Sequence, residues 1–152
     1  IEGSVTELAA VSSDGTQVPV TVVSPPGAVV PRRTLLEVYG AYGVSILPRY
    51  SPTYWVALRR GWNVAIGHIR GGAELGPAWQ AGGTGANKVN AALDTIAVAR
   101  KLQDDGVTAS WGLVARAASA GGVPLAVASV REPSLFAGVM LNSAIVNVAR
   151  LL

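Results

Sequence analysis

The chain has 152 residues, of which 50% are hydrophobic and only 14% are charged, and its mean hydropathy is +0.40. This is enough apolar material for one domain with a sizeable core, and it excludes an intrinsically disordered segment. The net charge of +3 comes from scattered arginines without a basic run, so nucleic acid is not an expected partner. The chain has no cysteine, which excludes disulfides, thiolate metal sites and a cysteine nucleophile.

The first part of the chain predicts an antiparallel hairpin. Residues 5–12 and 17–24 are rich in β-forming side chains, and Asp14-Gly15 between them is a strong turn signal. Prolines and a glycine in residues 25–31 then mark a loop. Residues 34–39 follow as a compact apolar strand that ends in a glycine-rich turn.

The rest of the chain predicts alternating helices and strands. We expect helices at residues 52–60, 86–102 and 120–130, and strands at residues 62–69, 112–116 and 137–141. In the second helix, the apolar face that we expect to pack on the sheet consists of Val89, Leu93, Ile96 and Ala97. This alternation predicts an α/β fold, with a doubly wound, mostly parallel sheet behind the N-terminal hairpin.

The most apolar stretch, residues 135–152, does not predict a membrane span, because polar residues such as Asn142 and Arg150 interrupt it. We interpret it as a buried strand that enters a helix, and we expect no membrane partner. The chain begins at Ile1 rather than Met, so we expect the native N-terminus to lie upstream, and a missing signal peptide says little about location. A cytoplasmic location is our expectation.

Ser119 is the residue that most suggests chemistry. It lies between an apolar strand and a helix start, in the run Ala117-Ala118-Ser119-Ala120-Gly121-Gly122. The nucleophile elbow of α/β-hydrolases places a serine on such a strained turn and needs small residues two positions before and after it. Those positions hold Ala117 and Gly121, so alanine replaces the first glycine of the usual pattern. On this motif alone, a helix-capping serine is the alternative.

Four sequence blocks, in order and at fitting spacing, resemble the catalytic domain of the prolyl oligopeptidase family. They are LEVYGAYG at residues 36–43, HIRGGAELG at 68–76 with Trp79, residues 82–94 with Gly82-Gly83, Ala86-Asn87-Lys88, Asn90 and Asp94, and residues 117–122. The resemblance covers about residues 14–152 and is nearer to the oligopeptidase B branch. It implies that residues 1–152 are part of an α/β-hydrolase peptidase catalytic domain, without its C-terminal strands and helices and without the family's β-propeller.

The resemblance also implies a reaction. Ser119 would be the nucleophile that attacks a peptide carbonyl, and hydrolysis would proceed through an acyl-enzyme without a metal or an organic cofactor. The backbone N–H of Ala120 would be one oxyanion donor, and the hydroxyl of Tyr39 would be the second. One such donor contributes roughly 3 kcal/mol to the stabilisation of a transition state. Without the resemblance, Tyr39 would be interpreted as a tyrosine that covers a strand end.

Several charged residues are predicted to support the fold and not to take part in the reaction. Arg70 and Glu74 match a family block in which we expect ion pairs that fix a loop over the sheet. Lys88 and Asp94 are expected to be scaffold residues, with Asp94 as a solvated or paired carboxylate and not the acid of a triad. His68 is the single histidine and precedes the serine in the chain, so we expect a structural role for it.

No residue after Ser119 is Asp or His, whereas the family's triad follows the order serine, acid, histidine. We therefore expect this chain alone to be nearly inactive, because a serine without an adjacent base is a weak nucleophile. We also expect a free sheet edge with exposed apolar surface, and self-association through it. Two alternatives stay open: a degenerate, non-catalytic α/β module that serves interactions, and an esterase or acylaminoacyl hydrolase on the same fold. Cleavage specificity is not predicted.

Overall fold

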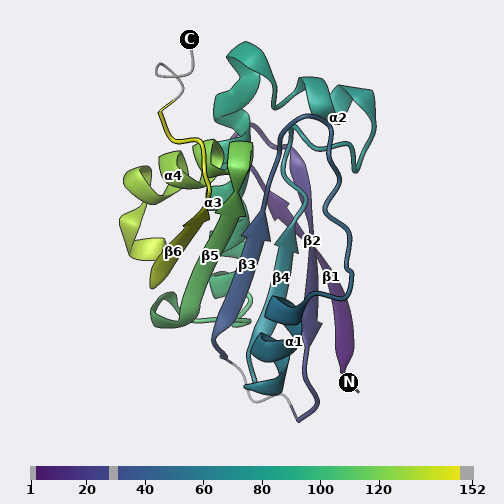
Figure 1. Ribbon diagram of the computed structural model, residues 1–152, viewed down its shortest axis with the longest axis vertical. Helices are drawn as coiled ribbons and strands as arrows, with labels where there is room; N and C mark the ends of the chain where they lie inside the picture. Colours follow the sequence, from purple (N-terminus) through teal and green to yellow (C-terminus); the bar gives the residue numbers. More distant parts are fainter. Residues whose placement is uncertain (1–2, 28–30, 148–152) are drawn as a thin grey trace.

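The computed structural model describes residues 3–27 and 31–147, and in this part six strands form one sheet in the order β1-β2-β4-β3-β5-β6 (Figure 1). The strands are β1 (Ser4–Val11), β2 (Gln17–Ser24), β3 (Thr34–Val38), β4 (Asn63–Gly67), β5 (Leu113–Ala118) and β6 (Gly138–Asn142). The helices are α1 (Pro52–Arg59), α2 (Pro77–Ala81), α3 (Lys88–Asp104) and α4 (Gly122–Arg131). None of the helices in the described part combines the length and the hydropathy that a membrane crossing requires.

The predicted N-terminal hairpin is confirmed. Strands β1 and β2 pair antiparallel, and Gly15 in the turn between them has a φ of +84°, which glycine adopts at little cost. The Oδ1 atom of Asp14 accepts a hydrogen bond from the Thr16 backbone N–H at 3.0 Å, as is common for aspartate in a turn. Strand β2 pairs antiparallel with β4, and the pairs β3–β4, β3–β5 and β5–β6 are parallel. The predicted α/β class with a doubly wound sheet is therefore also confirmed.

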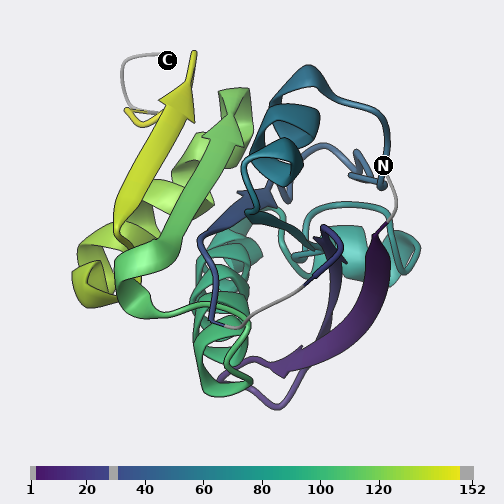
Figure 2. The same cartoon turned by 90° about the horizontal axis from the view of Figure 1, so that it is seen from below.

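The sheet separates two hydrophobic layers because successive side chains of a strand point to opposite faces. Leu35 of β3 packs with Tyr54 and Ala57 of α1 on one face. Leu36, the next residue, belongs to a larger cluster on the other face, which includes side chains of α3 and α4. Figure 2 shows α1 and the long helix α3 on opposite sides of the strands. Strand β4 is buried along its whole length, as expected for a parallel strand that is covered on both faces.

The predicted packing face of α3 is correct only in part. Ile96 is buried in the core and Ala97 packs against it, but Val89 is 42% exposed and Leu93 is only partly buried. The buried side chains of α3 also include small ones that were not predicted: Ala91, Ala92, Thr95 and Ala99. Small side chains allow a helix to approach a sheet closely; a Cβ added at Gly67 of β4 would lie only 3.3 Å from Val98 Cγ1. The pattern of larger apolar residues therefore indicated a face that overlaps with the true contact only in part.

Strand β6 differs from the predicted buried strand. Among residues 3–27 and 31–147 it pairs only with β5, at the edge of the sheet, and Val139, Met140 and Leu141 are 38–45% exposed. The expected free edge with exposed apolar side chains is thus present. No helix follows β6 up to residue 147, and the rest of the helix predicted for this stretch lies outside the described residues.

The chain connections change direction between β3 and β5. From β3 the chain passes through α1 to β4 on one side, and from β5 it passes through α4 to β6 on the other side. In open α/β sheets, the carboxyl ends of two adjacent strands with divergent connections leave a crevice where ligands bind. This topology places the candidate site at the ends of β3 and β5, which are the positions of Tyr39 and Ser119.

Candidate active site

Ser119 lies on a strained turn between β5 and α4. Strand β5 ends at Ala118, a 3-10 turn spans Ser119–Gly121, and α4 begins at Gly122. The φ of Ser119 is +50°, in the left-handed region that costs an ordinary residue about 1–2 kcal/mol. The side chain is exposed at the carboxyl end of the strand. An exposed serine on a strained strand-to-helix turn is the geometry of a nucleophile elbow.

The turn is held by close packing of its two glycines. A Cβ at Gly121 would lie 2.8 Å from Tyr39 Cδ2, and a Cβ at Gly122 would lie 2.5 Å from the Cβ of Ala144. The Ile145 N–H donates a 2.9 Å hydrogen bond to the carbonyl oxygen of Ser119. Loops from the ends of β3 and β6 thus enclose the turn, and no side chain larger than hydrogen fits at either glycine without a shift.

Alanine in place of the first glycine of the motif does not prevent this geometry. Ala117 is a residue of β5 and is 1% exposed, with its methyl group in the core between the sheet and the helices. The strain is carried two residues later, at Ser119. The elbow therefore forms with alanine at this position.

The strain at Ser119 predicts that replacing it stabilises the fold. Ser119→Gly should raise the free energy of unfolding by about 1 kcal/mol, because glycine adopts a φ of +50° without a Cβ clash. The matched control is Ser129→Gly inside α4, which should lower this free energy by about 0.5–1 kcal/mol. Urea denaturation of both variants measures the two changes in the free energy of unfolding. If both variants are less stable than wild type, backbone strain at Ser119 is excluded as the cause.

Tyr39 follows β3 directly and lies against the elbow. Besides the ring contact, a Cβ at Gly121 would lie 3.0 Å from the Cα of Tyr39, so the tyrosine backbone also touches the turn. Tyr39 is partly buried, and Ala120 in the turn is buried. The three residues proposed from the sequence, Ser119, Ala120 and Tyr39, are thus neighbours at the switch between β3 and β5.

A cavity of about 330 Å³ opens beside the elbow. Its wall includes Ala120 and Val123 at the start of α4, Ile145 after β6, and Tyr42 on the loop after β3. Lys88 at the start of α3 is the single charged residue among the described residues that line it. The cavity can therefore accept an apolar group of a molecule that reacts at Ser119.

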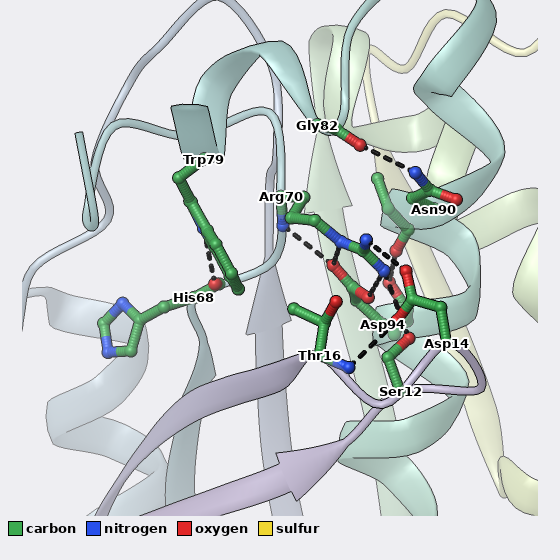
Figure 3. Close-up of polar contacts among 11 residues, drawn as sticks. Ser12, Asp14, Thr16, His68, Arg70, Trp79, Gly82, Asn90 and Asp94 are labelled. Carbon is green, nitrogen blue, oxygen red and sulfur yellow. Dashed lines mark hydrogen bonds and ion pairs between the residues drawn. The ribbon is translucent and has the colours of Figure 1, made fainter. Parts of the chain in front are cut away.

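A buried network around Arg70 fixes the loop at the end of β4 (Figure 3). The Arg70 guanidinium donates to both carboxylate oxygens of Asp94, from Nε at 2.9 Å and from Nη2 at 2.6 Å, and the Arg70 backbone N–H donates to Asp94 at 3.0 Å. Arg70 also donates to Asp14 at 2.5 Å and to Ser12 at 3.3 Å. Asp94 is fully buried, and its hydrogen bond with Arg70 raises the pKa of the guanidinium. The ion pairing predicted for Arg70 is confirmed, and Asp94, which was expected to be solvated or paired, is its buried partner. Glu74, for which an ion pair was also expected, has only the imidazole of His68, at 3.8 Å, as a basic neighbour among the described residues.

Asp14 couples the stability of the hairpin to pH. Its hydrogen bond from Arg70 lowers the pKa of the carboxyl far below the usual value of 3.8. A lowered folded-state pKa gives stability that is present above pH 3.8 and is lost as pH falls below it. At pH 6, the free energy of unfolding of wild type should exceed that of Asp14→Asn by up to about 1 kcal/mol. The half-exposed position of the carboxylate limits the size of this difference. The difference should shrink at pH 2. The control is Asp104→Asn, which removes an exposed carboxylate. If the difference between wild type and Asp14→Asn grows at pH 2, the lowered pKa of Asp14 is contradicted.

His68 has a packing role away from the elbow. Its Nε2 lies 2.9 Å from the Thr21 hydroxyl, and its Nδ1 lies 3.8 Å from Glu74. Its backbone carbonyl accepts a 3.1 Å hydrogen bond from Trp79 (Figure 3). It follows β4, which is separated from β5 by β3, so the two strands lie about 10 Å apart. These contacts agree with the predicted structural role. Glu74 fixes the neighbouring loop by accepting a 2.9 Å hydrogen bond from the Ile46 N–H.

Two features of the site were not predicted from the sequence. Asp14 pairs with Arg70, 56 positions away, and Lys88 donates to the carbonyl oxygen of Gly40, 48 positions away. Pairing across such separations leaves no local pattern. The described residues contain no cluster of three or more histidine, aspartate or glutamate side chains that could hold a metal ion.

The comparisons with known proteins agree with the geometry. The sequence profile of the prolyl oligopeptidase family matches residues 48–151. "Prolyl endopeptidase-like" of Pongo abelii is 34% identical over 95% of this chain and 20% of its own length, and "Protease 2" of Moraxella lacunata is 34% identical over 86% and 19%. The solved structure of oligopeptidase B from Trypanosoma brucei with covalently bound antipain superposes with a TM-score of 0.92 at 32% identity, over 96% of this chain and 21% of that one. The chain thus spans about a fifth of the length of these relatives.

Proposed function

This chain belongs to the prolyl oligopeptidase family, and we propose that it carries the nucleophile and both oxyanion donors of a serine peptidase. The observation that supports this most is Ser119, exposed at a φ of +50° on the turn between β5 and α4. The packing of Tyr39 against Gly121 of the same turn adds support, because it keeps a phenol beside the serine.

The proposed reaction uses these groups in two steps. The Ser119 oxygen attacks the carbonyl carbon of a peptide bond while its proton moves to a general base, and the carbonyl oxygen becomes an oxyanion. The backbone N–H of Ala120 and the hydroxyl of Tyr39 stabilise that charge. Collapse releases the amine and leaves an ester at Ser119, which water then hydrolyses. The cavity beside Ala120 would receive an apolar part of the substrate.

We propose that this chain alone is a very slow catalyst. His68 contacts Thr21, and Asp94 is buried against Arg70, so neither lies free to act on Ser119. In serine proteases, an oxyanion hole without a complete triad still retains about 10³–10⁴-fold acceleration over water. In one such enzyme, loss of the base lowers kcat by about six orders of magnitude. Residual reactivity at Ser119 should therefore be detectable but small.

A fluorophosphonate probe tests the proposal. Prolonged incubation followed by peptide mass spectrometry should find the adduct on Ser119 in preference to every other serine, because the oxyanion donors accelerate attack only there. Ser119→Ala should remove the adduct, and His68→Gln should leave its rate unchanged. Adducts spread over several serines would favour the non-catalytic module, and loss of labelling in His68→Gln would assign the base to His68. An esterase would give the same labelling at Ser119. Assays of peptide hydrolysis and of ester hydrolysis distinguish it from a peptidase.

The free edge of β6 leads to a proposal about self-association. We propose that a second copy pairs with this edge, because β6 pairs with β5 on one side, has no partner strand on the other side among the described residues, and exposes Val139, Met140 and Leu141. Sedimentation equilibrium should detect a dimer that Val139→Lys weakens by about tenfold or more. Thr6→Lys on β1, at the opposite edge of the sheet, is the control, and equal dimerisation in both variants would exclude β6. A peptide substrate and a cytoplasmic location stay predictions.

A further inference from the structure

Lys88 makes a contact that the proposed reaction does not use. Its ammonium, at the first residue of α3, donates a 2.5 Å hydrogen bond to the carbonyl oxygen of Gly40. Gly40 is the residue directly after Tyr39. Lys88 is partly buried, which lowers the pKa of its ammonium, and it forms no ion pair with a carboxylate within the described residues. A partly buried cation whose partner is a carbonyl oxygen is a costly arrangement for a residue with only a scaffold role.

The carbonyl that Lys88 binds belongs to a tightly packed crossing of two loops. Gly40 has a φ of +62°, and a Cβ there would lie 2.7 Å from the carbonyl oxygen of Arg70. A Cβ at Gly71 would overlap the Gly40 carbonyl oxygen, so that oxygen lies directly over the backbone of Gly71. Gly43 donates a 3.0 Å hydrogen bond to the Gly71 carbonyl. The loop after β3 is therefore fixed against the loop after β4.

Helix α3 holds both loops from one side. Asp94 in its second turn binds the side chain and the backbone N–H of Arg70, and Lys88 at its start binds Gly40. Tyr39 therefore lies between two fixed points: its ring and backbone lie against Gly121, and the carbonyl of the next residue, Gly40, accepts the hydrogen bond from Lys88. Lys88 also lines the cavity that Ala120 borders.

We infer that Lys88 is a positioning residue for the oxyanion site: its ammonium holds the Gly40 carbonyl and thereby keeps the Tyr39 hydroxyl directed at the substrate oxygen beside Ser119. This inference rests on the proposed function, because it assigns Lys88 to the donor that Tyr39 supplies. A hydrogen bond to a charged group is about twice as strong as a neutral one, which suits a contact that must keep a loop in register.

The test uses the whole chain labelled with 3-fluorotyrosine. The four tyrosines give separate ¹⁹F signals, and Tyr39→Phe assigns the signal of Tyr39. Lys88→Met should shift or broaden that signal. It should leave unchanged the signal of Tyr54, a buried residue of α1 on the other face of the sheet. Lys88→Arg should restore it, since arginine keeps a charged donor. Lys101→Met on the same helix, which removes a surface pair with Asp105, should change neither signal.

The rate of Ser119 phosphonylation supplies a second readout. Lys88→Met should slow it roughly tenfold in wild type and have no further effect in Tyr39→Phe, because residues that act through one another are not additive. An unchanged Tyr39 signal in a folded Lys88→Met chain, or equal slowing in both backgrounds, would overturn the inference. If Lys88→Met unfolds the chain, Lys88→Gln, which keeps a neutral donor, is compared in the same way. If wild type shows no preference for Ser119, the proposed function fails, while the fluorine signals still decide whether Lys88 positions Tyr39.

Discussion

Asp94→Ala should lower the free energy of unfolding by about 3–5 kcal/mol, because it removes the buried carboxylate partner of the Arg70 guanidinium and leaves only the half-exposed Asp14 as a counter-ion. Asp94 is fully buried and accepts three hydrogen bonds from Arg70, two of them from the guanidinium. This loss is a large part of the total stability of an ordinary domain. Urea denaturation, followed by tryptophan fluorescence, measures it. The matched control is Asp105→Ala, which breaks a solvent-exposed pair with Lys101 and should cost less than about 1 kcal/mol.

A double variant separates the loss of a contact from the cost of an unpaired charge. Arg70→Met with Asp94→Leu replaces both ions by apolar side chains and should recover most of the stability lost in Asp94→Ala. A double variant that is as unstable as the single one would show that the polar geometry itself is required. Equal losses in Asp94→Ala and Asp105→Ala would contradict the burial argument.

Gly121→Ala should destabilise the chain by about 1–3 kcal/mol and displace Tyr39, because the added methyl group meets the tyrosine. The new Cβ would lie 2.8 Å from Tyr39 Cδ2 and 3.1 Å from its carbonyl oxygen, and the backbone atoms cannot swing aside as a flexible side chain could. Phosphonylation of Ser119 should slow in parallel, since the tyrosine donor moves. Denaturation and labelling rates of the same preparation measure the two effects.

Gly138→Ala is the control for Gly121→Ala. Gly138 lies in β6, and its nearest neighbours to an added Cβ are methyl groups of Val114 at 3.8 and 3.9 Å, which is ordinary contact. This variant should be neutral or slightly stabilising, because alanine loses less backbone entropy than glycine on folding. Similar destabilisation by both substitutions would mean that the contact between Gly121 and Tyr39 is not the cause.

The sequence predicted the elements that have strong local signals. Asp14-Gly15 located the hairpin turn, and the short apolar runs located all six strands to within a few residues. The start of α4 beside Ser119 was evident because a row of small residues follows an apolar strand. These features depend on neighbours in the chain, so the chain order alone indicates them.

Features that depend on distant neighbours were not predicted, or were predicted incorrectly. The buried face of α3 includes Ala91, Ala92 and Ala99, whose burial reflects a close approach to the sheet and not a pattern of large apolar side chains. Helix α2 has only five residues, Pro77–Ala81, and is too short for a periodic signal. The bond from Lys88 to Gly40 exists only because the loops after β3 and β4 cross in front of α3.

Backbone strain is concentrated near the candidate site. In the described part of the chain, the non-glycine residues with positive φ are Tyr42, Ser119 and Ser143, and each lies shortly after the carboxyl end of β3, β5 or β6. Each such conformation costs of order 1–3 kcal/mol and persists only where the surroundings fix it. Their concentration at one edge of the sheet agrees with a reactive site there.

The most direct test of the proposed function places Ser119 within the full-length chain of a relative. In a chimera, residues 3–147 replace the matched segment of the Moraxella lacunata relative, which is 34% identical over 132 residues. We predict that a folded chimera hydrolyses a peptide substrate of that relative, that Ser119→Ala abolishes this activity, and that Tyr39→Phe lowers kcat by about 10²–10³-fold. A folded chimera without activity, or one whose activity survives Ser119→Ala, would contradict the assignment of Ser119 as the nucleophile.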